Sequence, residues 1–180
     1  MSASSFRADS ADISGSLKLD TEFRYGYYYG TADLASSPAL SSGVHLPFGY
    51  VNTERSSISD EVTYVAPMSG SLDRLMIRFL SGSGSPAFTN AATSISSVIG
   101  ELTASMIASS DRLSTSGDEK EDVYITSALG FDNGILFQFS GSNQFNPGDH
   151  IGIKLSSTNN ITADNTLELL YTSVFKYTLD

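Results

Sequence analysis

The stretch Phe145-Asn146-Pro147-Gly148-Asp149-His150-Ile151-Gly152-Ile153-Lys154-Leu155 says most about how this chain folds. It begins with a tight turn, because proline presets its own φ angle and glycine adopts backbone conformations that other residues avoid. From His150 onward, apolar residues alternate with others, as in a strand with one buried face. A polar segment, 156–165, and a closing strand, 167–179, follow. This succession is typical of the end of a β-sandwich, and nothing near it resembles a reaction centre.

Further short strands are expected upstream of this stretch. They cover residues 21–29, 44–51, 57–65, 71–80, 123–129 and 135–139. Most are rich in β-branched or aromatic residues and are bounded by Gly, Ser or Pro, which favour turns. In residues 71–80, Leu75, Ile77 and Phe79 lie on one face, and the arginines at 74 and 78 lie on the other. This period of two predicts a strand with one buried face.

The segments between these strands are expected to be loops or turns. They cover residues 30–42, 66–70, 81–86, 111–122 and 140–146. Asn133-Gly134 predicts a hairpin between the strands at 123–129 and 135–139, because both residues tolerate a positive φ. Residues 95–107 fit a helical spacing as well as a strand, and their Ser and Thr content favours the strand.

The predicted fold is all-β, an antiparallel β-sandwich of jelly-roll type with an extended N-terminal arm. A chain of 180 residues suits one domain. We place that domain at residues 56–180. Residues 1–55 are expected to form an arm with one or two strands, which makes contacts outside its own domain.

The charge and composition of the chain argue against several classes of partner. Its net charge is −10, from 10 basic and 20 acidic residues, so neither a nucleic acid nor an anionic membrane surface is an expected partner. Cysteine is absent, which removes disulfides, thiol catalysis and cysteine metal sites. The first residues lack the apolar region of a signal peptide, and no apolar run has transmembrane length.

Residues that could carry chemistry do not form a recognisable motif. His45 and His150 are far apart in the sequence, and the 32 serines make chance Ser/His/Asp combinations common. The acidic run 118–122 could hold Ca²⁺ through its oxygens, but its spacing is not that of an EF-hand, and a solvated loop is the simpler interpretation. We therefore expect no enzymatic activity, no cofactor and no metal.

The aromatic residues of segment 21–29 are the more informative set. On a strand, Tyr25, Tyr27 and Tyr29 share one face and Tyr28 points to the other. Such side chains in a chain with only 17% charged residues either fill a core or form an interface. The candidate interface residues are Phe6, Ile13, Leu17, Leu19, Phe23, Tyr25, Tyr27 and Tyr29.

Three segments resemble structural proteins of tailed bacteriophages, especially those of marine and cyanobacterial hosts. They are Tyr64-Val65-Ala66-Pro67-Met68-Ser69-Gly70-Ser71-Leu72, the stretch Phe145 to Ile153 quoted above, and Val174-Phe175-Lys176-Tyr177. The shared pattern is an aromatic-Val-Ala-Pro turn, a Gly-Asp-led strand and a final aromatic-Lys-Tyr strand. It covers about two thirds of the chain, and residues 1–55 do not match it.

This resemblance implies a virion component with a jelly-roll domain. The function that we expect is capsid decoration: an oligomer, a trimer in many such proteins, binds the major capsid protein, and the arms bridge neighbouring subunits. Such a protein is made in the host cytoplasm and resides on the capsid surface. Two alternatives stay open, a tail or fibre adhesin that binds host-surface glycans and a sugar-cleaving enzyme with two facing carboxylates.

Overall fold

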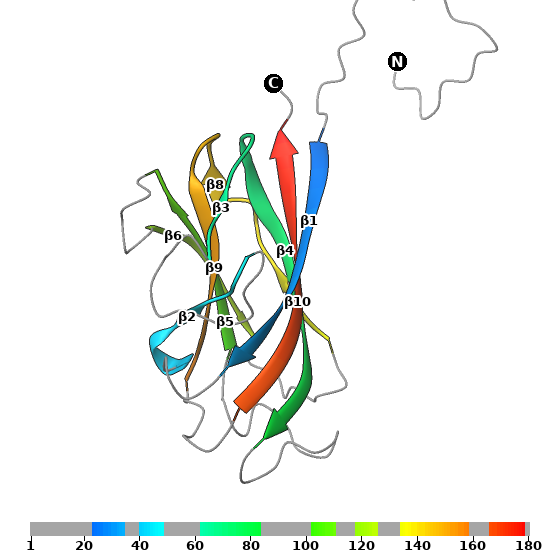
Figure 1. Cartoon of the computed structure of the whole chain (residues 1–180). Coiled ribbons are helices and arrows are strands. Elements are labelled where there is room, and N and C mark those ends of the chain that lie inside the picture. Colours follow the sequence, from blue (N-terminus) through cyan, green and yellow to red (C-terminus); the bar gives the residue numbers. More distant parts are fainter. Residues whose placement is uncertain are drawn as a thin grey trace, which may run out of the picture.

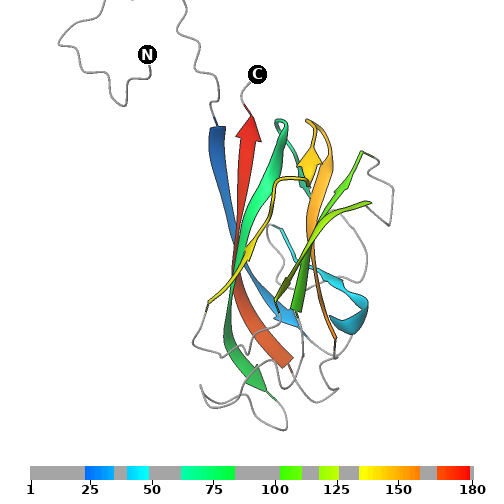
Figure 2. The same cartoon turned by 180° about the vertical axis from the view of Figure 1, so that it is seen from behind.

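Two antiparallel sheets pack face to face across a shared hydrophobic core (Figures 1 and 2). The computed structural model describes residues 23–34, 40–48, 62–83, 102–110, 118–125, 134–158 and 166–178. The first sheet, which we call the β10 sheet, holds β1 (Phe23–Leu34), β10 (Thr166–Thr178), β4 (Gly70–Ser83) and β7 (Ile135–Gln138) in that order, with β8 (Gln144–Phe145) also paired to β4. The all-β sandwich predicted from the sequence is thereby confirmed.

The second sheet, which we call the β9 sheet, is built around β9 (His150–Ser157). Its order is β2 (Val44–His45), β9, β5 (Leu102–Ser109) and β6 (Asp118–Ile125), and β3 (Tyr64–Val65) pairs with β9 as well. A short 3₁₀ turn, η1 (Leu40–Ser42), precedes β2. Pro47 stands two residues after the end of β2, in keeping with the confinement of proline to edges and ends of sheets.

The strand order is that of a jelly roll. β2 and β3 both pair with β9 and count as one interrupted strand, and β7 and β8 both pair with β4 and count as another. The eight resulting strands then pair first with last, second with seventh, third with sixth and fourth with fifth. A long antiparallel hairpin rolled up into two sheets produces this order.

The boundary expected between residues 55 and 56 does not separate an arm from the domain. β1 pairs with β10 over its whole length, from Phe23↔Thr178 to Leu34↔Leu167, and β2 pairs with β9. Residues 23–48 therefore contribute strands to both sheets. Candidate arm residues Phe6, Ile13, Leu17 and Leu19 lie outside the described residues.

Several expected loops are strands in the structure. β1 continues to Leu34, β4 continues to Ser83, and the acidic run at 118–122 belongs to β6. The ambiguous segment at 95–107 is a strand from residue 102 onward. The described strands on either side of Asn133-Gly134 do not form the expected hairpin, because β6 pairs with β5 in one sheet whereas β7 pairs with β4 in the other, and residues 126–133 lie outside the described residues.

The interior is filled by alternate residues of both sheets. Leu75, Ile77 and Phe79 of β4 are buried and the arginines at 74 and 78 are exposed, which confirms the predicted alternation. On β1 the interior positions include Gly26 and Gly30, over which the rings of Tyr177 and Tyr171 lie. A Cβ at Gly30 would come within 2.5 Å of the Tyr171 hydroxyl oxygen. These glycines therefore leave room for tyrosines of the neighbouring strand.

The two turns singled out in the sequence lie against each other at one end of the sandwich. Gly148 has a φ of +88°, which fits the third position of a turn with proline before it. The Asp149 side chain accepts a hydrogen bond from the Asn146 backbone N–H at 2.8 Å. Gly148 N–H donates to the Ala66 carbonyl, and Ala66 N–H donates to that of Asp149, both at 2.8 Å. The 66–69 and 146–149 turns thus hold each other.

Candidate functional site

The outer face of β1 carries a row of exposed aromatic side chains, Phe23, Tyr25, Tyr27 and Tyr29, which we call the aromatic row. Their exposure rises from 37% at Phe23 to 84% at Tyr29. Large apolar rings at this level of exposure are uncommon on a free surface and mark contact sites. Of the two interpretations left open by the sequence, core filling does not apply to these four exposed residues, and the interface stays a prediction.

Tyr28 points the other way and belongs to the core. Its ring centroid lies 4.5 Å from that of Tyr64, 5.5 Å from Phe175 and 6.2 Å from Phe48. Burial, together with a hydrogen bond to Tyr64, raises the pKa of Tyr28 to about 12, so its hydroxyl is neutral at physiological pH. The aromatic segment thus places alternate residues in the core and on the surface.

The apolar character of the outer face extends across the β10 sheet beyond the aromatic row. Leu170 on β10, Met76 on β4 and Leu136 on β7 are each 41–49% exposed. Val174 lies between Tyr27 and Arg74 in the strand register and points to the same side, although it is itself buried. We call the aromatic row together with these aliphatic residues the apolar face. It spans the sheet from β1 to β7.

β1 is also an edge strand of the described sheet. Its neighbour there is β10, and among the described residues no strand pairs with its other side. It is twelve residues long and carries only two charged residues, Arg24 and Asp33. Long edge strands with few charges are templates for pairing with another chain. The edge of β1 therefore adds backbone donors and acceptors beside the apolar face.

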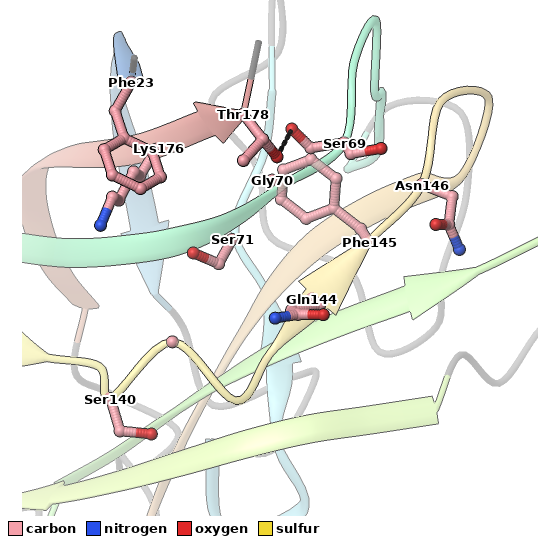
Figure 3. Close-up of a pocket in the computed structure, with 11 residues that line it drawn as sticks. Phe23, Ser69, Gly70, Ser71, Ser140, Gln144, Phe145, Asn146, Lys176 and Thr178 are labelled. Atoms are coloured by element: carbon pink, nitrogen blue, oxygen red, sulfur yellow. Dashed lines mark hydrogen bonds between the residues drawn. The ribbon is translucent and has the colours of Figure 1, made fainter. Parts of the chain in front are cut away.

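A hollow of about 600 Å³ lies at the end of the sandwich where β1 begins and β10 ends (Figure 3). Its lining comes from β1, β4, β8, β10 and the connection between β7 and β8. The lining residues are Phe23, Ser69, Gly70, Ser71, Ser140, Gly141, Gln144, Phe145, Asn146, Lys176 and Thr178. Its volume falls within the range of small-ligand sites.

Strand register places the polar side chains of this hollow in a row. Lys176 lies opposite Ser71, and Ser71 lies opposite Gln144, so the three residues share the outer face of adjacent strands. The Lys176 Nζ atom sits 3.7 Å from the centroid of the Phe23 ring. Thr178 closes the end through its backbone and side chain, which both donate to the Ser69 carbonyl, at 3.0 and 3.2 Å (Figure 3).

The connection between β7 and β8 is held in place by the side chain of Asn143. This residue is fully buried, and its amide replaces a strand partner for Leu72: the Leu72 N–H donates to Asn143 Oδ1 at 2.7 Å, and Asn143 Nδ2 donates to the Leu72 carbonyl at 3.0 Å. Nδ2 also donates to Glu121 Oε2 of β6 at 2.7 Å. Asn143 therefore links the two sheets behind the hollow.

Glu121 holds the same connection from the β9 sheet. Its Oε1 accepts the Ser140 backbone N–H at 2.5 Å, while Oε2 accepts from Asn143. Burial raises the pKa of this carboxyl, but the hydrogen bonds from Ser140, Asn143 and Ser142 outweigh burial and bring the pKa below its ordinary value of 4.5. The ionised form is thus the one that the fold stabilises.

A Glu121→Gln variant is expected to be less stable than the wild type above pH 4.5, the ordinary pKa of the group. Because the folded-state pKa is lowered, the stabilisation is complete above the ordinary pKa and is lost as the pH falls through the lowered value. Urea denaturation of both proteins from pH 7 to pH 3 measures the difference. Asp122→Asn, an exposed change on the same strand, is the control. A wild-type advantage that persists unchanged to pH 3 would contradict the assignment.

The other residues considered in the sequence do not gather into a site. His45 is buried on β2, and His150 begins β9 opposite Val65 and Ser109. Residues 118–122 belong to β6, which pairs with β5. Within the described residues, no group of three or more His, Asp or Glu side chains could hold a metal ion. That part of the chain also holds no helix long and apolar enough to span a membrane.

No pattern in the sequence indicated that Asn143 and Glu121 form a hydrogen-bonded pair. Asn143 stands in an ordinary Ser/Asn-rich loop, and Glu121 stands in a charged run. The pair becomes visible only when β6 and β4 are placed in facing sheets. The hollow was missed for the same reason, since its lining residues span positions 23 to 178.

Comparison with known proteins adds little to this picture. No protein-family model and no curated protein matches the chain. Four chains of solved structures match. One of them, from the structure of infectious bursal disease virus, Gx strain, is 13% identical with a TM-score of 0.30, over 97% of this chain and 42% of that one. The chain spans less than half of that viral chain, and a likeness of this level supports no functional conclusion.

Proposed function

We propose that this chain is a non-enzymatic structural protein of a bacteriophage particle, which decorates the capsid and stabilises the head. The observation that carries the proposal is the apolar face of the β10 sheet, with the aromatic row at its edge. A jelly roll that exposes such a face has a surface suited to assembly rather than to catalysis.

The resemblance to phage structural proteins is the reason for proposing a bacteriophage particle. Its first two segments contain the 66–69 and 146–149 turns, which hydrogen-bond to each other, and its third is part of β10. All three segments therefore form the framework that supports the apolar face. In this proposal the partners are the major capsid protein and further copies of the chain as a homotrimer, and the location is the capsid surface.

The binding free energy expected from the aromatic row suits a protein that acts in many copies. Removing one large apolar side chain from water contributes about 1.5–3 kcal/mol, so a few residues of the aromatic row give each copy moderate affinity. Attachment at many equivalent positions then adds up, because each further contact within one oligomer is intramolecular. A shell decorated in this way resists expansion and disassembly more than a bare shell does.

The test is a double variant, Tyr27→Ser with Tyr29→Ser, at the two most exposed positions of the aromatic row. We expect unchanged folding but at least tenfold weaker self-association or shell binding, since about 1.4 kcal/mol corresponds to a factor of ten. Light scattering gives the mass, and cryo-electron microscopy of particles gives the occupancy. Val65→Ser, which removes a similarly exposed apolar residue from the β9 sheet, is the control. Wild-type mass and occupancy in the double variant would refute the proposal.

A second candidate function is host-surface glycan binding by a tail or fibre component. The observation that favours it is the hollow, which combines the exposed ring of Phe23 with the amide side chains of Gln144 and Asn146 at one end of the sandwich. Aromatic rings and amides are the groups that contact sugars. The Tyr27 and Tyr29 substitutions lie outside this hollow, so glycan binding should survive them.

A further inference from the structure

We infer that the hollow binds an acidic saccharide, and that Lys176 pairs with the carboxylate of a hexuronic acid or similar sugar. The inference deepens the glycan-binding candidate and rests on it. Phe23 belongs to both the aromatic row and the hollow, but capsid decoration is tested at Tyr27 and Tyr29, which do not line the hollow.

The charge of the hollow is opposite to that of the protein. The chain carries a net charge of −10, yet among the residues that line the hollow Lys176 is the one with a charged side chain. Arg78 lies on the same outer face of the β10 sheet, whereas Arg74 on that face is paired with Asp73 Oδ2 at 2.7 Å. Within the hollow itself, an anion therefore meets one ammonium and no carboxylate of the lining, which favours a negatively charged ligand.

Two carboxylates, those of Asp149 and Glu121, hold the wall of the hollow from outside its lining. Asp149 accepts the backbone N–H of Asn146, and Glu121 accepts that of Ser140. Asn146 and Ser140 line the hollow, while the two acidic residues do not. Each carboxylate thus satisfies a backbone donor of the wall, and the ammonium of Lys176 is left as the charged group of the lining.

The neutral groups of the lining match a ligand with many hydroxyls. Hydroxyls come from Ser69, Ser71, Ser140 and Thr178, and amides come from Gln144 and Asn146. Hydroxyls and amides can both donate and accept, as sugar hydroxyls require, although Thr178 Oγ1 already donates to the Ser69 carbonyl and Ser140 Oγ to Ser142 Oγ. The ring of Phe23, 37% exposed, offers a flat apolar surface against which a sugar ring can pack. Figure 3 shows Phe23 and Lys176 side by side at one wall, with Ser71 and Gln144 next to them.

A single ammonium fits one carboxylate better than it fits a phosphate. Phosphate monoesters carry between one and two negative charges at neutral pH and are bound by arginine forks or clustered cations. The lining offers one lysine, a compact charge on a flexible stem. In the structure this ammonium lies over the Phe23 ring at 3.7 Å, and such cation–π pairs are weak at exposed sites. A carboxylate can therefore replace the ring as its partner.

The experiment compares an oligomer of hexuronic acid with a neutral oligohexose of the same length, using isothermal titration calorimetry. We expect the wild type to bind the acidic oligomer at least tenfold more tightly than the neutral one. Lys176→Gln should lose this preference, and Lys176→Arg should retain most of it. Lys120→Gln, which removes a lysine from β6 of the other sheet, should bind as the wild type does. Denaturation midpoints of all variants verify that the fold is intact.

The outcomes separate this inference from the function on which it rests. Equal affinity for both oligomers, or an acidic preference that survives Lys176→Gln, would overturn the assignment of Lys176 while leaving glycan binding in place. Failure to bind any saccharide would remove the glycan-binding candidate and this inference together. Occupancy of capsids by the Lys176→Gln variant tests decoration separately, and decoration should persist.

Discussion

Asn143→Asp is expected to destabilise the sandwich strongly at neutral pH, although it changes one atom of a side chain. The new carboxylate oxygen would replace Nδ2, which lies 3.0 Å from the Leu72 carbonyl and 2.7 Å from Glu121 Oε2. Both oxygens lose a donor and face a negative charge from a side chain that is itself fully buried. Leaving the buried Leu72 carbonyl without its donor costs about 1–3 kcal/mol, and placing a second carboxylate against the partly buried Glu121 increases this cost.

The pH dependence of this variant is diagnostic. Repulsion from Glu121 raises the folded-state pKa of the new aspartate, so the deficit is largest above that raised pKa and shrinks as the pH falls through it. The protonated acid can again donate to its neighbours. Asn143→Ala cannot recover in this way, and Gln138→Glu, an exposed amide-to-acid change on β7, should cost little. Urea titrations from pH 7 to pH 4 measure all three. Equal stability of Asn143→Asp and the wild type at pH 7 would contradict the bridging role.

The features that the sequence predicted are those encoded by a local period of two. The alternation of Leu75, Ile77 and Phe79 with two arginines marks the buried face of β4, and the alternation of tyrosines marks both faces of β1. A one-residue shift would exchange the faces, so such patterns specify orientation. The turn at 146–149 was predictable for a related reason, because proline followed by glycine fits one turn geometry.

The features that the sequence did not predict depend on pairing with distant strands. Residues 30–34 are rich in small and polar residues and resemble a loop, yet they continue β1 because β10 pairs with them and Tyr171 lies over Gly30. Residues 118–122 look like a solvated acidic loop, yet β5 draws them into a strand. Propensity is a weak guide where a long partner strand supplies hydrogen bonds and side-chain contacts.

The two candidate sites also differ in whether a local sequence pattern predicts them. The aromatic row was predictable from the sequence as either core or interface, and the packing of Tyr28 against the core places its neighbours on the outer face, where the interface stays a prediction. The hollow was not predictable, because its wall joins the start of β1, the start of β4 and the end of β10. No local pattern in the sequence records that those three ends meet.

Phe175→Ala should cost more stability than other truncations of an aromatic side chain in the described part of the chain, about 3–5 kcal/mol, the usual range for a buried phenylalanine. Phe175 is fully buried on β10, and its ring contacts Tyr28, Tyr64, Phe145 and Tyr177 at centroid distances of 5.5–6.4 Å. Its loss leaves a cavity between the two sheets that four rigid rings cannot all move to fill.

The consequence reaches both candidate sites, because the ring supports strands that carry them. Tyr28 belongs to β1 beneath the aromatic row, and Phe145 lines the hollow. Phe23→Ala, which truncates a half-exposed ring on the outer face, is the matched control and should shift the urea midpoint little. A loss of 3–5 kcal/mol would remove a large share of the stability of an ordinary domain, so Phe175→Ala should also weaken oligomers formed through β1. Denaturation midpoints that are equal for the two variants would show that the aromatic cluster does not hold the sheets together.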